Sequence, residues 1–332
     1  MSDLSWGQGP TQFFYQLDGQ AIFSALEFLK LRPTGTMMGL NSFENRVYEL
    51  GIEPDERTFN EKSVVAKFYR PGRWSEQQIL EEHQFMAELA EVEIPVIAPL
   101  LLNGKSLHRD EATSLFYCVY SRRGGRAPED LTDERAMRLG RLLGRAHLVG
   151  KAHSADHRVR YTPEFIGAGA IENMRQSVLI DERLKSQILE VGERICQKLA
   201  LPWQGLALQR IHGDLHPGNI LERDRDLWIL DFDDMAMGPT MQDFWMILPS
   251  PEEASELWAS FAEGYEMFLP FPWEQIRLIP YLRCLRMLHF HGWISKRWED
   301  PAFALAFEQY QRPAPWEQLL GYLQMELQRD IV

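Results

Sequence analysis

Three residues near the middle of the chain carry the kinds of group that phosphoryl transfer requires. The stretch HGDLHPGNIL, residues 212–221, contains Asp214 and Asn219, and a second stretch, DFDD, begins at Asp231. A carboxylate can act as a general base, and carboxylate and amide oxygens are hard ligands that suit Mg²⁺. Together these residues predict one base and two metal ligands for a reaction of a magnesium nucleotide.

The segments between these residues predict how the three side chains converge. We expect a short strand, a loop and the two arms of a hairpin, at residues 208–211, 212–219, 220–222 and 227–230. The hairpin turns at 223–226 and brings its two ends together, so Asp231 should lie close to Asn219.

Two histidines in the same loop raise zinc as an alternative metal. His212 and His216 are four residues apart, and imidazole nitrogens are common zinc ligands. The Gly-Asp and Pro-Gly pairs argue against a helix here, so helical facing of the two rings does not apply and zinc is disfavoured. A surface turn without a chemical role is also disfavoured, because the motif is so dense in polar groups.

This segment resembles the catalytic loop of eukaryotic-like kinases in the aminoglycoside and choline kinase branch. In that branch HGDxHxxN replaces the HRDxxxxN of protein kinases, and a segment of the DxD type replaces DFG. The resemblance implies that Asp214 is the catalytic base and that Asn219 and Asp231 bind Mg²⁺. Asp231 would thus serve both catalysis and metal binding, with ATP as the phosphoryl donor.

A kinase of this kind also needs a lysine on an upstream strand, and Lys67 fits that place. In SVVAKFY, residues 63–69, alternate residues share a face, so Lys67 lies in mid-strand and is costly to bury without an anionic partner. A helix expected over 75–91 carries two candidate partners, Glu81 and Glu82. The resemblance favours Glu82, since a helix points only one of two adjacent residues at a given target, and it assigns Lys67 to the nucleotide phosphates.

The loop that covers the phosphates in kinases is harder to recognise. The stretch GTMMGLNSFENRVY, residues 35–48, lacks the G-x-G-x-x-G pattern that lets a backbone approach phosphates closely. However, LNSFENRVY, KFYRPGRW and ILEEHQF closely resemble one bacterial family, the stress response kinase A family. In that family the serine of this loop is associated with ATP, which indicates Ser42 here. Ordinary turn chemistry would also explain the Asn-Ser pair.

The resemblance extends from about Thr34 to about Ala302 and implies both a fold and a function. The implied fold is α+β and bilobal and resembles that of protein kinases. A small lobe with an antiparallel sheet is expected at 1–121, and a larger, mainly helical lobe at 122–332. The implied function is that of an ATP- and magnesium-dependent Ser/Thr protein kinase in a bacterial stress response. Its partners would be ATP and a protein bearing Ser or Thr, and we expect a cytoplasmic monomer.

The sequence pattern also predicts the elements of the two lobes. Strands are expected at 36–42, 47–53, 63–69, 96–102 and 115–121. Further helices are expected to begin at Thr132 and to span 181–201. The many tryptophans beyond Pro239 are expected to lie in the core and to bind no ligand.

Composition excludes several classes of protein. The 332 residues are 45% hydrophobic, enough for two cores, and no apolar run approaches the ~18 residues of a membrane span. The formal charge of −13 argues against binding to nucleic acid or to an anionic membrane. Cys118, Cys196 and Cys284 are widely spaced and odd in number, so we expect reduced, buried thiols.

The residues after Asp231 leave the acceptor open. Seven residues separate Asp231 from Pro239, and none is Ser, Thr or Tyr, so control through a phosphorylated activation loop is not expected. Small-molecule kinases share this shortness, and the alternative is therefore a hydroxyl kinase acting on an amino alcohol, sugar or aminoglycoside. A non-enzymatic nucleotide-binding protein is disfavoured because the expected lysine, base and metal ligands are all present.

Two more acids follow the expected metal ligand. Asp233 could reach a second Mg²⁺ or cap a turn. Asp243 resembles the acid that braces the catalytic loop from a helix start in these kinases. We expect it to bind loop amides through charge-assisted hydrogen bonds without entering the chemistry.

Overall fold

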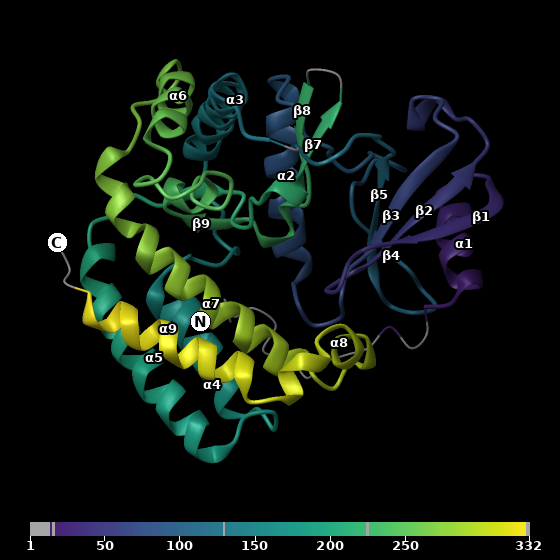
Figure 1. Ribbon diagram of the computed structural model, residues 1–332. Coiled ribbons are helices and arrows are strands. Elements are labelled where there is room, and N and C mark those ends of the chain that lie inside the picture. Colours follow the sequence, from purple (N-terminus) through teal and green to yellow (C-terminus); the bar gives the residue numbers. More distant parts are fainter. Residues whose placement is uncertain (1–13, 15–16, 129, 224–225, 330–332) are drawn as a thin grey trace.

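The computed structural model describes residues 14, 17–128, 130–223 and 226–329. It contains a small lobe built on an antiparallel sheet and a larger lobe of helices, which lie side by side in Figure 1. The α+β, bilobal fold expected from the sequence is therefore confirmed. The boundary expected between residues 121 and 122 stays a prediction, although it falls directly after the last strand of the sheet.

The small lobe consists of one five-stranded sheet with a helix against one face. Neighbouring strands are antiparallel and follow the order β1 (Pro33–Leu40), β2 (Arg46–Ile52), β3 (Ser63–Phe68), β5 (Phe116–Ser121) and β4 (His108–Arg109). Helix α1 (Gly19–Phe28) shares a core with Val64, Ala66 and Phe68 of β3. Lys67 therefore lies on the opposite face of β3, as the alternation predicts, and its ammonium contacts Asp231 and Asp233 of the large lobe.

The prediction of a strand over 96–102 is wrong. This segment makes only single bridges, such as those from Val96 to Ile229 and from Pro99 to Tyr120. Proline has no backbone N–H to donate, so a proline in the middle of the segment interrupts any continuous ladder. The fifth strand of the sheet is instead the short β4.

Helix α2 (Glu76–Glu91) stands between the sheet and the helices of the large lobe in Figure 1. A capping box closes its first turn, because the side chains of Ser75 and Gln78 each bond the other residue's backbone N–H. The helix expected over 75–91 is thus confirmed. Its apolar residues, among them Phe85 and Met86, belong to the core of the large lobe and not to that of the sheet.

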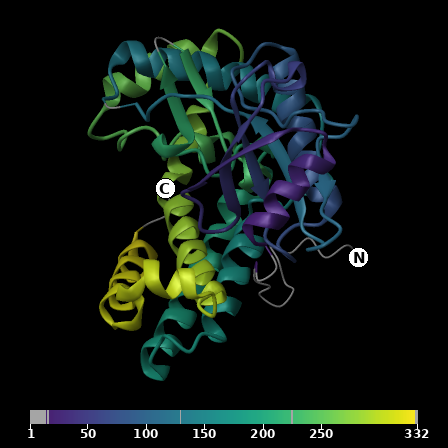
Figure 2. The same cartoon turned by 90° about the vertical axis from the view of Figure 1, so that its right-hand side faces the viewer.

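Helices form most of the large lobe. They are α3 (Asp133–Ala152), α4 (Ala168–Arg175), α5 (Glu182–Trp203), α6 (Ser255–Glu266), α7 (Ile279–Arg297), α8 (Pro301–Ala306) and α9 (Ala314–Gln328). The two helices expected from the sequence are α3 and α5, which are capped by Thr132 and Asp181. Helix α3 packs against α6, α4 against α7, and α5 against α9. Figure 2 shows the C-terminal helices, in yellow, below the sheet of the small lobe.

Four short strands flank the catalytic-loop residues and the DFDD stretch that form the site. Strand β6 (Gln209–Ile211) pairs with β9 (Ala236–Gly238), and β7 (Ile220–Arg223) pairs with β8 (Asp226–Ile229). The strand and hairpin expected from the sequence are thus present, while part of the turn between β7 and β8 lies outside the described residues. Because Ile220 pairs with Ile229, the two ends of the hairpin meet.

Expectations about the core are met in part. Cys118 and Cys284 are buried free thiols, whereas Cys196 is half-buried, and burial raises the pKa of all three to about 12. Trp258 lies in the core as expected, but Trp273 is 49% exposed. Within the described part of the chain, none of the helices combines the length and the apolar character needed to cross a membrane.

Candidate active site

The catalytic loop, residues 212–219, is held from the protein interior. Buried Asp243 accepts hydrogen bonds from the backbone N–H groups of His212 (2.8 Å) and Gly213 (2.9 Å), and it also contacts the ring of His147. Bonds to a buried carboxylate are charge-assisted, so they fix the start of the loop. The bracing contacts expected for Asp243 are therefore present, although Asp243 lies in a short 3-10 turn and not at the start of an α-helix.

His212 joins this loop to the segment before Asp231. Its Nε2 donates to the carbonyl of Leu230 (2.7 Å), and its Nδ1 accepts from the N–H of Asp214 (3.3 Å). Both ring nitrogens are thus used within the protein, which gives His212 a structural role. The N–H of Leu230 in turn donates to the carbonyl of Asn219 (2.9 Å), and Asp231 follows directly, as the hairpin predicts.

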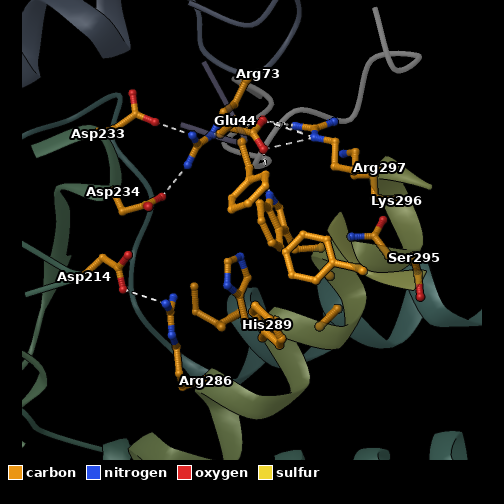
Figure 3. A pocket seen from close by; sticks show the side chains of 18 of the residues that line it. Glu44, Arg73, Asp214, Asp233, Asp234, Arg286, His289, Ser295, Lys296 and Arg297 are labelled. Carbon is orange, nitrogen blue, oxygen red and sulfur yellow. Dashed lines mark hydrogen bonds and ion pairs between the residues drawn. The ribbon is translucent and has the colours of Figure 1, made fainter. Parts of the chain in front are cut away.

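Asp214 and Asn219 face the same cavity. The side-chain N–H of Asn219 donates to the carbonyl of Asp214 (2.9 Å), which leaves the amide oxygen of Asn219 for another partner. One carboxylate oxygen of Asp214 lies 2.8 Å from the guanidinium of Arg286, an ion pair visible in Figure 3. The other oxygen lies 4.0 Å from His216, and burial lowers the pKa of that histidine.

Asp231 has a backbone conformation that few non-glycine residues adopt. Its φ is +55°, in the left-handed region, and its side chain is 55% exposed and lines the cavity. Asp tolerates this region better than most residues, and such strained conformations concentrate at functional sites. The carboxylate lies 3.2 Å from the ammonium of Lys67, so the two residues singled out from the sequence meet across the lobes.

Lys67 is buried among three acids. Its ammonium lies 3.0 Å from Asp233, 3.2 Å from Asp231 and 3.6 Å from Glu82. Burial acts to lower the pKa of Lys67, but the carboxylates outweigh it and hold the pKa well above its ordinary value. Lys67 therefore stays charged near neutral pH. Burial also raises the pKa of Glu82 to about 7, in spite of the attraction of Lys67.

Of the two glutamates expected to compete for Lys67, Glu82 faces it. Glu81 instead accepts hydrogen bonds from the backbone N–H groups of residues 156–158 and from the ring of His157. Adjacent residues of α2 thus point to different targets, as the geometry of a helix requires. Glu82 lies 3.6 Å from Lys67, and Glu81 ties α2 to the loop that follows α3.

Arg73 connects the small lobe to the DFDD turn. Its guanidinium binds both Asp233 and Asp234, as Figure 3 shows. The catalytic loop lies against the same turn, because a Cβ added at Gly213 would stand 2.2 Å from the carbonyl oxygen of Asp234. Only glycine therefore allows this approach, and the φ of +87° at Gly213 requires glycine as well. Burial raises the pKa of Asp234 to about 6, although Arg73 opposes that shift.

The covering loop, residues 41–45, joins β1 to β2 and is fastened to the large lobe. Its buried Glu44 pairs with Arg297 at the end of α7 and accepts a hydrogen bond from the indole of Trp293 (2.6 Å). Burial alone would raise the pKa of Glu44, but Arg73, Arg297 and a third arginine outweigh it and lower the pKa to about 2. The loop is therefore held by a carboxylate that stays ionised throughout the neutral range.

A cavity of about 1400 Å³ joins these parts. Its walls come from the covering loop, the catalytic loop, a π-helical turn at Pro163–Gly167, and helices α4 and α7. Ser42 lines this cavity, and its hydroxyl also accepts a hydrogen bond from the N–H of Asn45 (3.3 Å). Its position is thus compatible with both expected roles, contact with ATP and formation of the turn.

The donor groups at the cavity fit magnesium. Asn219 offers an amide oxygen and Asp231 an exposed carboxylate, and both are hard oxygen donors. No three His, Cys, Asp or Glu side chains of the described residues are grouped so as to hold a metal by themselves. Mg²⁺ commonly takes one or two protein carboxylates and completes its shell with water and substrate phosphates, so two protein ligands suffice.

The sequence did not single out Glu44, Arg73 or Arg286 as parts of this site. Glu44 and Arg73 lie in LNSFENRVY and KFYRPGRW, two strings that carry the family resemblance, so charged residues within them were an available signal. Arg286 lies on α7 outside any such string. Only its contact with Asp214 in the folded protein reveals it.

Comparison with known proteins assigns this arrangement to a family. Residues 37–279, which include the covering loop, Lys67, the catalytic loop and the DFDD turn, match the phosphotransferase enzyme family. The chain belongs to the phosphotransferase enzyme family. It is therefore a phosphotransferase of the kinase type, as the catalytic loop predicts.

Stress response kinases are among the phosphotransferases that this chain resembles. It is 35% identical to stress response kinase A of Escherichia coli (strain K12) over 297 residues, which cover 89% of this chain and 88% of that protein. It is 36% identical over 301 residues, with the same coverage, to the serine/threonine protein kinase RdoA of Salmonella typhimurium. The family resemblance expected from the sequence is thus confirmed.

Solved structures of other phosphotransferases share the fold. Amicoumacin kinase hAmiN has a TM-score of 0.71 at 19% identity, covering 94% of this chain and 98% of that one. A microcompartment-associated aminopropanol kinase has a TM-score of 0.69 at 19% identity, covering 94% and 99%. At this level of identity the likeness establishes the bilobal fold alone.

Proposed function

We propose that this phosphotransferase is an ATP- and magnesium-dependent kinase that phosphorylates Ser or Thr hydroxyl groups of proteins. The observation that carries the proposal is the convergence of Asp214, Asn219 and Asp231 on one cavity, with Lys67 ion-paired to Asp231. A base, two hard oxygen ligands and a buried cation are the parts that phosphoryl transfer from ATP requires.

Each of these residues has its own role in the reaction. Asp214 takes the proton of the acceptor hydroxyl as that oxygen attacks the γ-phosphorus of ATP. Lys67, held in place by Glu82, binds the ATP phosphates, and Ser42 contacts them from the covering loop. Mg²⁺ bound by Asn219 and Asp231 would neutralise negative charge on the phosphates.

The names of the relatives support a protein as the acceptor. The Salmonella relative is named a serine/threonine protein kinase, and the Escherichia coli relative a stress response kinase. A role in the stress response, a cytoplasmic location and a monomeric state stay predictions from the resemblance.

A small-molecule acceptor is the second candidate. The structures with the same fold include a kinase for amicoumacin and one for aminopropanol. In addition, strand β9 begins at Ala236, directly after the DFDD turn, which leaves no room for the long activation loop of protein kinases. These observations favour a hydroxyl kinase whose acceptor is an amino alcohol, a sugar or an aminoglycoside.

Transfer of label from γ-labelled ATP decides between these acceptors. The protein is incubated with Mg²⁺ and labelled ATP, once with a library of Ser- and Thr-containing peptides and once with a panel of amino alcohols, sugars and aminoglycosides. We expect label on the peptides and none when Asp214→Asn replaces the native protein. Label on a soluble alcohol alone would establish the second candidate. ATP binding without transfer to either set would leave only a nucleotide-binding function.

A further inference from the structure

Arg286 lies on α7 and binds the residue proposed as the base. Its Nη2 is 2.8 Å from Oδ1 of Asp214, and its side chain is 30% exposed at the cavity that both residues line. Figure 3 shows the guanidinium extending from α7 to the carboxylate. Arg286 thus places its positive charge in direct contact with the proposed base.

Arg286 has a more open position than two other arginines at the cavity. Its side chain is 30% exposed, whereas those of Arg73 and Arg297 are 10% and 6% exposed and are bound by acids. The contact with Asp214 is made through Nη2, which leaves other N–H donors of the guanidinium available to a ligand in the cavity.

We propose that Arg286 is a catalytic residue, whose guanidinium holds Asp214 and at the same time contacts the phosphoryl group as it passes to the acceptor. This role rests on the proposed function, in which Asp214 receives the hydroxyl proton. A base must stand about 2.6–3.2 Å from the hydroxyl that it deprotonates, and the phosphorus bonds to that same oxygen. The planar guanidinium carries five N–H donors, so those not facing Asp214 can reach the phosphoryl oxygens.

The reaction balances with Arg286 in this place. The acceptor oxygen forms a bond to the γ-phosphorus, and its proton goes to Asp214. The bond from phosphorus to the bridging oxygen breaks, and its electron pair leaves with ADP. Negative charge is spread over the three equatorial oxygens during transfer, and a fixed guanidinium stabilises that charge.

Other described cations at the cavity have different positions or partners. Arg73 is bound by the two acids of the DFDD turn, and Arg297 by the covering loop. Lys296 lies beside Arg297, across the cavity from Arg286 in Figure 3. Arg286 is therefore the cation that lies beside Asp214, where we expect the acceptor hydroxyl to bind.

Binding of a transition-state analogue tests this role without knowledge of the acceptor. The affinity for ADP is measured with Mg²⁺, with and without tetrafluoroaluminate, which imitates the phosphoryl group in transfer. In the native protein we expect the anion to tighten ADP binding at least ~100-fold. Arg286→Met should lose most of this gain while the affinity for ADP alone is unchanged, and Arg286→Lys should keep part of it. Arg283→Met is the matched control, because Arg283 lies on the same helix over the ring of Trp245.

The outcomes separate this role from the proposed function. A native-like gain in Arg286→Met, or an equal loss in Arg283→Met, would overturn the assignment of Arg286. Loss of the gain in Arg286→Met with retention in Asp214→Asn would support a direct contact with the phosphoryl group. Equal loss in both variants would reduce Arg286 to a residue that only positions the base. If the native protein shows no gain, the proposed function fails and the role of Arg286 fails with it.

Discussion

The catalytic loop and the covering loop face one cavity, yet they are held in opposite ways. In the catalytic loop, Asp243 and His212 form hydrogen bonds with backbone groups inside the large lobe. In the covering loop, Glu44 depends on side chains from both lobes, Arg73 of the small lobe and Arg297 of α7. The first loop keeps its shape as long as the large lobe is folded. The second keeps its position only while the two lobes stay together.

We expect this difference to suit the two loops to different tasks. A loop fixed by buried backbone hydrogen bonds suits the chemical step, which needs reacting groups held within a fraction of an ångström. A loop held by ion pairs between lobes can open and close as nucleotide enters and product leaves. Changes beside the catalytic loop should therefore act mainly on the reaction, and changes in the covering loop mainly on nucleotide affinity and stability.

The largest effect should follow the loss of the Asp231 carboxylate. We expect Asp231→Ala to lower kcat/KM for ATP by ~10³-fold or more, because stabilisation by a metal ion contributes several kcal/mol. Asn219→Ala should have a smaller effect, since it removes a neutral ligand. Asp231→Ala should also lower the free energy of unfolding by about 1 kcal/mol, because alanine tolerates the left-handed φ of +55° less well than aspartate. Asp226→Ala, an exposed acid on the same hairpin, is the control. Restoration of activity by zinc and not by magnesium would contradict the metal site.

A somewhat smaller effect is expected for Lys67 and Glu82, the pair in which Lys67 is proposed to bind the ATP phosphates. Lys67→Met should lower kcat/KM for ATP by ~10²–10³-fold, which is typical for the loss of one preorganised charge. Glu82→Gln should lower it less, because Lys67 keeps two other acids. Since the two residues act as a unit, the double variant should lose little more than Lys67→Met alone. Strict additivity of the two losses would show that they are not partners.

The covering loop should show its dependence on ion pairs through pH. The pKa of Glu44 is about 2 in the folded protein and 4.5 in its ordinary state, so the carboxylate stabilises folding above pH 4.5 and loses this effect as pH falls toward 2. At neutral pH, Glu44→Gln should lower the free energy of unfolding by about 3 kcal/mol. The difference from the native protein should shrink below about pH 4.5.

Denaturant unfolding measured between pH 3 and pH 8 checks this expectation. Glu53→Gln is the control, because Glu53 belongs to an exposed pair with Arg32 and should change stability by less than about 1 kcal/mol. A stability difference for Glu44→Gln that stays constant down to pH 3 would show that the loop does not depend on this charge. The comparison between the two loops would then lose its physical basis.

The smallest effect should come from Ser42 of the covering loop. Loss of one hydrogen bond costs about 1 kcal/mol, so Ser42→Ala should raise KM for ATP about fivefold and leave kcat nearly unchanged. Ser42→Thr, which keeps the hydroxyl, should restore most of the affinity. A variant that lowers kcat and leaves KM unchanged would move Ser42 from the nucleotide to the chemical step.

The parts of the fold that follow from contiguous residues were predictable from the sequence. The capping box at Ser75 begins α2, and the short hairpin brings Asp231 beside Asn219, because both features arise from local hydrogen bonding. The alternation in β3 likewise placed Lys67 on the face opposite Val64 and Ala66. The prediction of a strand over 96–102 was wrong because it gave more weight to the apolar composition of the segment than to the proline in its middle.

Contacts between distant segments could not be derived in this way. Glu44 and Arg297 are 253 residues apart, and the pairing of Asp214 with Arg286 likewise depends on how α7 packs beside the catalytic loop. Nothing in the local pattern of α7 separates Arg286 from the other arginines of that helix. Packing of the two lobes selects these partners, so only the folded structure identifies them.

The identity of the base is the central claim, and Asp214→Asn tests it most directly. Single-turnover transfer from labelled ATP should fall by ~10²–10⁴-fold, the typical contribution of general-base catalysis, while the affinity for ATP with Mg²⁺ stays within about twofold of native. The braced catalytic loop should also keep its stability, because the bonds to Asp243 do not involve the Asp214 side chain. Near-native transfer in Asp214→Asn would contradict the account.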